Sequence, residues 1–141
     1  MELSFDSGVK EYTIRGVNGI VTVHFNPADV NFAKKAYRVF NDLRKKQEER
    51  VSKLDTTEPG DELFDMVDSI DREMRDIIND LFEQDIADTL FGSVNAYSAA
   101  NGAPVWQNFM NAIIDQFDEA TKREQALADE KIRKYTQKYK K

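Results

Sequence analysis

The stretch KEYTIRGVNGIVTVHFNPADVNF, residues 10–32, decides the fold because it joins two expected strands, a turn and the start of a helix. KEYTI and IVTVHF are rich in β-branched and aromatic residues, which favour strands. Asn18-Gly19 between them is the dipeptide most typical of a tight hairpin turn. The sequence therefore predicts an antiparallel hairpin. A lone hairpin is marginal in water, so helices or another subunit must cover it.

The second strand of this hairpin has two different faces. Val21, Val23 and Phe25 alternate on one face, which we expect to be buried. Thr22 and His24 lie on the other face, so the single histidine is expected at the surface or at a subunit contact. An additional strand is expected at LSF, residues 3–5.

A helix is predicted directly after the second strand. In HFNPADVNF, Asn26 suits the N-cap, Pro27 the first helical position and Asp29 the first turn. Phe25 and Val30 fall at the two positions of a hydrophobic staple. This helix is expected to run to about residue 54, and its second half, RKKQEERVSK, is charged almost all round.

Further helices follow a break at DTTEPG, residues 55–60. The second helix repeats apolar residues at alternating spacings of four and three, which is an a/d seam. A short helix is expected at 86–90, another after Pro104, and a last, weakly amphipathic one from about residue 129. Three of these predicted helices each carry one apolar stripe. The stripe of the first helix is Val30, Ala33, Tyr37, Phe40, Leu43, Val51 and Leu54, and that of the second is Leu63, Val67, Ile70, Met74, Ile77 and Leu81. The stripe of the helix after Pro104 is Trp106, Phe109, Ile113, Phe117 and Ala120.

These elements predict an α+β, mostly α fold over residues 1–141, a usual length for one domain. A β-hairpin or small antiparallel sheet at 1–25 precedes a helical body at 26–127, and a basic helix or tail occupies 128–141. The whole fold is a bundle of about four to five helices beside the hairpin. Because the edge of a small sheet invites pairing, we also expect a homo-oligomer.

Composition restricts the classes of function. The chain has no cysteine, no apolar run of about 20 residues, and no signal peptide at its start, so an intracellular protein without membrane association is expected. Residues 131–141 hold six Lys or Arg and no acid, which leaves 14 basic and 26 acidic residues in positions 1–130. Such an acidic body argues against binding to nucleic acid.

The chain has few of the residue types that catalysis commonly uses. We therefore predict that the protein is not an enzyme and has no catalytic residue, no metal site and no cofactor. One histidine, no cysteine and no glycine-rich phosphate loop are present. The carboxylates between 61 and 76 resemble a magnesium site by spacing, but most project away from the apolar seam and are expected in solvent. Those expected in solvent are Asp61, Asp65, Asp68 and Asp76, whereas Asp71 and Glu73 flank the seam.

The uncharged stretch LFGSVNAYSAANGAPVW, residues 90–106, is the strongest remaining signal. Its aromatic residues either form an ordinary core or anchor a partner. We expect Phe91 and Trp106 to hold the stretch against the helices, and Tyr97 with its small neighbours to face outward as a contact surface. On this interpretation Tyr97→Asp spares the fold and weakens partner binding.

Several motifs resemble small proteins of Firmicutes siphophages and prophages that are regarded as tail assembly chaperones. The motifs are FNPADVNF, an FG-x-x-N-x-Y block at 91–97, GAPVWQN at 102–108 and KIRKYTQKYKK at 131–141. The resemblance implies a cytoplasmic, non-enzymatic protein that binds the tape-measure protein, helps to recruit tail-tube subunits and is absent from the mature virion. The partner-binding residues expected on this basis are Phe91, Asn95, Tyr97, Trp106 and Phe109.

Two other functions remain open from the sequence. The carboxylates between 61 and 76 could form part of a surface that mimics DNA, as in a phage-encoded acidic inhibitor of a host defence protein. A metal-dependent nucleotide hydrolase would instead use some of the same acids as ligands.

Overall fold

The structure, a computed structural model, describes residues 1–139 and confirms an α+β, mostly α fold. An N-terminal hairpin comes first, four helices follow it, and a second, very small hairpin precedes the last helix. The elements are β1 (Lys10–Gly16), β2 (Gly19–Phe25), α1 (Val30–Thr56), α2 (Asp61–Phe82), α3 (Ala87–Phe91), β3 (Ala99–Ala100), β4 (Ala103–Pro104) and α4 (Val105–Tyr139).

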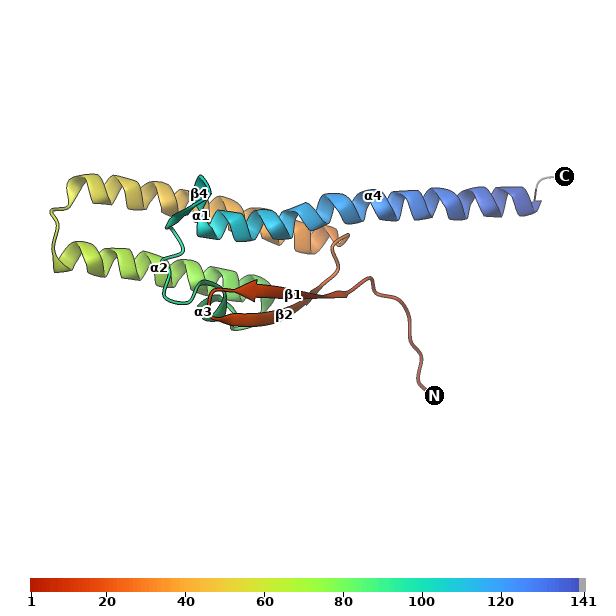
Figure 1. The fold of residues 1–141 in the computed structure, drawn as a ribbon. Helices are drawn as coiled ribbons and strands as arrows, with labels where there is room; N and C mark the ends of the chain where they lie inside the picture. The colour runs from red at the N-terminus through yellow and green to blue at the C-terminus, as the bar shows by residue number, and fades with distance from the viewer. Residues whose placement is uncertain (140–141) are drawn as a thin grey trace.

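The helices form an elongated body (Figure 1). α1 and α2 are antiparallel and joined at one end of the molecule, and α4 begins beside the middle of α1 and runs toward the other end. The last part of α4 extends past the rest of the body (Figure 1). The β1–β2 hairpin and α3 pack against one another on one side of the helices, so the hairpin is covered by helices as expected.

The hairpin turn is fixed by α3. The backbone N–H groups of Val17 and Asn18 donate to the carbonyl oxygens of Leu90 and Thr89 at 2.9 and 3.0 Å. A Cβ at Gly16 would lie 2.6 Å from both the Cα of Leu90 and the oxygen of Thr89, so only glycine permits this approach.

Aromatic packing joins the hairpin to three helices. Phe25 of β2 stacks on Tyr12 of β1 and on Phe32 of α1, with ring centroids 4.4 and 4.7 Å apart. Phe82 of α2 and Phe117 of α4 complete the cluster at 6.2 and 6.3 Å from Phe25. The predicted inner face of the second strand is therefore confirmed, since Val21, Val23 and Phe25 are all buried.

The predicted start of the first helix is wrong by three residues. Asn26 and Pro27 precede the helix, and Asn26 accepts a backbone hydrogen bond from Asp29 at 3.1 Å in a turn. Asp29 is the N-cap, and its carboxylate accepts from the backbone N–H of Asn31 at 2.9 Å. Val30 is 77% exposed, so it forms no staple with the buried Phe25.

The ends of the chain also differ from expectation. Leu3 and Phe5 are exposed and belong to no strand, so the predicted third strand is absent from the described residues. No separate helix begins near residue 129, because α4 continues without a break to Tyr139. No glycine or proline interrupts residues 105–139, which explains this continuity. The last two residues of the predicted basic tail, 140 and 141, lie outside the described residues.

Two predicted apolar stripes are buried only in part. Of the predicted α1 stripe, Leu43 is buried, Ala33, Phe40 and Leu54 are half-buried, and Val30, Tyr37 and Val51 are exposed. Of the predicted α2 seam, Met74 and Leu81 in the C-terminal half are buried, and Leu63, Val67, Ile70 and Ile77 are half-buried. Arg75 and Ile78, which the predicted seam did not include, are also buried. At the joined ends of α1 and α2 the reason is geometrical, because these ends reach beyond the hairpin and α4 and are covered only by each other (Figure 1).

Candidate partner-binding site

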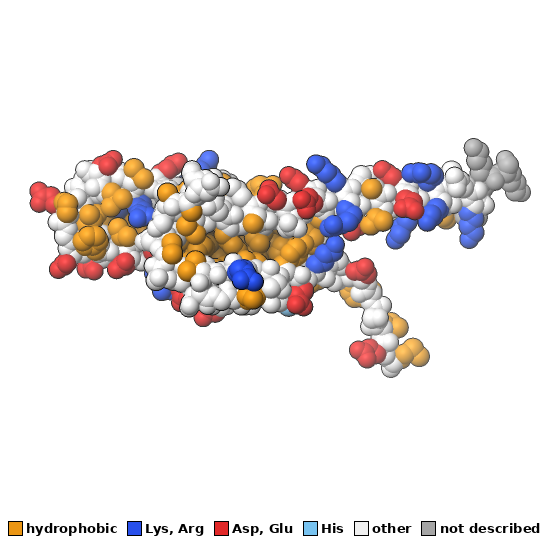
Figure 2. Space-filling view, viewed as in Figure 1, with side chains coloured by type: hydrophobic (Ala, Val, Ile, Leu, Met, Phe, Trp, Pro, Cys, Tyr) orange, Lys and Arg blue, Asp and Glu red, His pale blue; other side chains and the backbone are white. Residues whose placement is uncertain are grey.

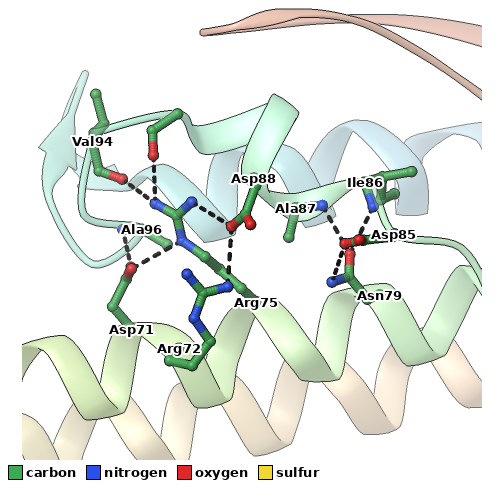
Figure 3. A network of polar contacts seen from close by, with 11 residues as sticks. Asp71, Arg72, Arg75, Asn79, Asp85, Ile86, Ala87, Asp88, Val94 and Ala96 are labelled. Atoms are coloured by element: carbon green, nitrogen blue, oxygen red, sulfur yellow. Dashed lines mark hydrogen bonds and ion pairs between the residues drawn. The ribbon is translucent and has the colours of Figure 1, made fainter.

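Arg75 on α2 fixes the connector between α2 and α4, which comprises residues 83–104 (Figure 3). Its guanidinium donates to the carbonyl oxygens of Gly92 and Val94 at 2.9 and 2.8 Å, and to the carboxylates of Asp71 and Asp88 at 2.9 and 3.0 Å. The Arg75 side chain is only 6% exposed. A buried charge is tolerated only when it is paired and hydrogen-bonded, as it is here.

Two more polar residues of α2 hold the same connector (Figure 3). The Asp71 carboxylate accepts from the backbone N–H of Ala96 at 2.7 Å. The Asn79 side-chain oxygen accepts from the backbone N–H groups of Ile86 and Ala87, both at 2.8 Å. These side chains therefore satisfy backbone donors of the connector and leave the main-chain course of residues 86–96 well defined.

The predicted site residues lie mostly inside the protein. Phe91 and Trp106 are buried, which confirms that they hold the connector against the helices. Asn95 and Phe109 are half-buried. Tyr97 is only 4% exposed, so its predicted outward orientation is wrong.

Tyr97 is buried because the charged half of α1 covers this part of the connector. The guanidinium of Arg50 covers the Tyr97 ring at 5.0 Å from its centroid, and Gln47 accepts a hydrogen bond from the Trp106 indole N–H at 3.2 Å. Of the small neighbours of Tyr97, Ser98 is half-buried, and Ala99 and Ala100 are exposed as expected. They form the small β3–β4 hairpin rather than an irregular surface loop.

We expect Tyr97→Asp to unfold the protein substantially rather than spare its fold. Loss of the buried ring costs about 3–5 kcal/mol of unfolding free energy, and a carboxylate would be left in its place. Tyr97→Phe is the matched control. The buried Tyr97 hydroxyl has no hydrogen-bond partner within residues 1–139, so removing it should change stability by less than about 1 kcal/mol. Urea unfolding followed by circular dichroism measures both, and equal stabilities of the two variants would contradict the burial of Tyr97.

An apolar groove lies on the surface between β1 and α4. Its cavity is about 150 Å³ and is open to solvent. In Figure 2 a band of hydrophobic side chains runs between α4 and the hairpin, where this groove lies. The groove is lined by Tyr12, Thr13 and Ile14 of β1 and by Phe109, Ala112, Ile113 and Gln116 of α4.

The groove combines a strand edge with a helix face. β1 pairs only with β2 in the described chain, and three consecutive β1 residues line the groove, so its unpaired edge borders it. Burial raises the pKa of the Tyr12 phenol above its ordinary value. Ala112 is small and exposed, which leaves space above α4. Phe109 belongs to this groove, whereas the other four predicted site residues do not line it.

Other parts of the described chain are weaker candidates for a functional site than this groove. Asp61, Asp65, Asp68 and Asp76 are exposed, as expected of a solvated face. Within residues 1–139 no group of three potential ligands is arranged to hold a metal ion, and no helix is long and apolar enough to cross a membrane. A cavity of about 660 Å³ beside Arg72 and Arg75 is not a ready anion site, because both guanidinium groups already bind Asp88.

Neither protein-family models nor the curated proteins and solved structures compared with this chain match it. The groove, the buried connector and the motifs of the sequence are therefore the observations on which a function can be based.

Proposed function

We propose that this protein is a phage tail assembly chaperone that binds a helical segment of the tape-measure protein in the β1–α4 groove. The groove itself carries the proposal, because it is an exposed apolar surface bordered by a helix and an unpaired strand edge. The motif resemblance supplies the identity of the partner. In this proposal the protein is not an enzyme, acts in the host cytoplasm, helps to recruit tail-tube subunits and leaves before the virion matures.

The groove suits an amphipathic helix. Such a helix presents apolar residues at positions i, i+3, i+4 and i+7, and an apolar groove takes them up as anchors. Phe109, Ala112, Ile113 and Gln116 lie on successive turns of α4 and form one wall of matching periodicity. The acidic charge of residues 1–130 opposes aggregation while this apolar surface is exposed.

Co-expression with the tape-measure protein of the same genome tests the proposal. We expect the two proteins to co-purify, and the complex to survive high salt because apolar contacts are not screened by ions. An insoluble tape-measure protein with no complex would contradict the proposal. A different partner from the host, bound only at low salt, would instead favour the acidic-inhibitor function suggested by the exposed carboxylates of α2.

A substitution in the groove should separate binding from folding. Ala112→Glu places a charge in the groove at an exposed helix position, so we expect an unchanged fold and partner binding weakened at least tenfold. Ala100→Glu, at the exposed small hairpin, is the control and should bind normally. Quantitative pull-down of the tape-measure protein measures both variants. Loss of binding in Ala100→Glu alone would contradict the groove and indicate that the partner contacts the small hairpin.

A further inference from the structure

The last part of α4 forms an arm that is exposed along its length and meets the body only near its start, where Glu124 and Lys131 line a cavity with residues 6–8. We define the arm as residues 121–138, all of which are exposed, and it is about 27 Å long. The arm continues the packed part of α4, but its own turns gain little from tertiary packing, which supplies most helical stability in proteins. The arm nevertheless carries large apolar residues, among them Leu127 and Ile132, of which Ile132 is 64% exposed. A partner that covers these residues would stabilise the arm.

The end of the arm is basic. Residues 131–139 contain Lys131, Arg133, Lys134 and Lys138 and no acidic residue. Figure 2 shows blue side chains gathered toward this end of the molecule. An apolar residue, Ile132, lies among these cations, so a matching surface would be both apolar and acidic.

The opposite end of the molecule is both apolar and acidic. We define the tip as residues 51–68, the joined ends of α1 and α2, which hold six acidic residues and one basic residue. Phe64 is 62% exposed and Val51 is 50% exposed. In Figure 2 hydrophobic side chains gather at this end with acidic groups around them.

The two surfaces cannot meet within one chain, because α4 runs away from the tip and its arm lies at the far end (Figure 1). Each arm has a net positive charge and each tip a net negative charge, so contacts between two arms or between two tips are electrostatically unfavourable. We propose that the arm of one copy docks on the tip of the next copy, so that the chain assembles head to tail. Such a heterologous contact leaves one tip and one arm free, and it grows into a ring or a filament.

The test uses the full chain alone, so it is independent of the tape-measure protein. Phe64→Asp disables the tip and Ile132→Asp disables the arm, both at exposed positions. Sedimentation velocity should show that the unmodified protein associates as its concentration rises, and less so at high salt. Each variant alone should associate at least tenfold more weakly. Val30→Asp, at an exposed position outside both surfaces, should behave as the unmodified protein does.

Mixing the two variants gives the decisive result. The intact arm of Phe64→Asp can bind the intact tip of Ile132→Asp, so the mixture should form a 1:1 dimer and nothing larger. An arm-to-arm or tip-to-tip contact would not be rescued by mixing. The proposal is overturned if the unmodified protein stays monomeric up to about 1 mM, if neither variant weakens association, or if mixing restores nothing. Lys131→Glu with Arg133→Glu is a second arm variant if Ile132→Asp perturbs the helix.

Discussion

Trp106→Ala will lower the free energy of unfolding by about 3–5 kcal/mol, which is a large part of the stability of a domain of this size. Trp106 is 1% exposed and lies where the connector enters α4. Its ring packs edge-on against Phe40 of α1 at 5.3 Å, and its indole N–H donates to Gln47. Alanine would remove both contacts and leave a cavity between α1 and α4.

Trp106→Phe is the matched control, because it keeps an aromatic ring and loses the hydrogen bond. We expect a clearly smaller loss than for alanine. Urea unfolding should be followed by far-ultraviolet circular dichroism, since Trp106 is the only tryptophan and its fluorescence is lost in both variants. A loss below about 1 kcal/mol in Trp106→Ala would contradict its place in the core.

Arg75→Met will cost about 3–5 kcal/mol, because it breaks a buried ionic network by removing one partner. Asp71 is 15% exposed and would remain as a carboxylate without its main cationic partner. The carbonyl oxygens of Gly92 and Val94 would also lose their donor. The connector should therefore loosen before the helices unfold.

Arg72→Met provides the control for this effect. Arg72 binds the same Asp88 carboxylate, at 3.1 Å, but its side chain is 57% exposed. Exposed ion pairs contribute little, so we expect a loss of no more than about 1 kcal/mol. Hydrogen exchange of the backbone amides at Ala96 and Val94 would locate the difference. Equal stability of the two variants would contradict the structural role of Arg75.

Much of the fold could be predicted from local signals. The strand alternation of residues 19–25 and the break at 55–60 each depend on residues within one short segment, and both lie where expected. The small β3–β4 hairpin has a signal of the same kind at residues 101 and 102. Asn101 and Gly102 have φ values of 55° and 85°, and Asn-Gly favours such a turn.

The site depends on contacts between distant parts of the chain, and these are not visible in the sequence. Tyr97 looks like a surface residue among small, uncharged neighbours, but Arg50, far back on α1, covers it. Arg75 looks like a residue of a polar helix face, yet it is buried because the connector supplies its acceptors. The groove forms only when β1 and α4 come together, so of its lining residues only Phe109 and Ile113 could be selected from their helical spacing.

A photo-reactive amino acid at position 112, in protein co-expressed with the tape-measure protein, tests the central claim most directly. The account predicts a cross-link from position 112 to the apolar face of a tape-measure helix, and none from the same group at the exposed position 100. A cross-link from position 100 and none from position 112 would contradict binding in the β1–α4 groove.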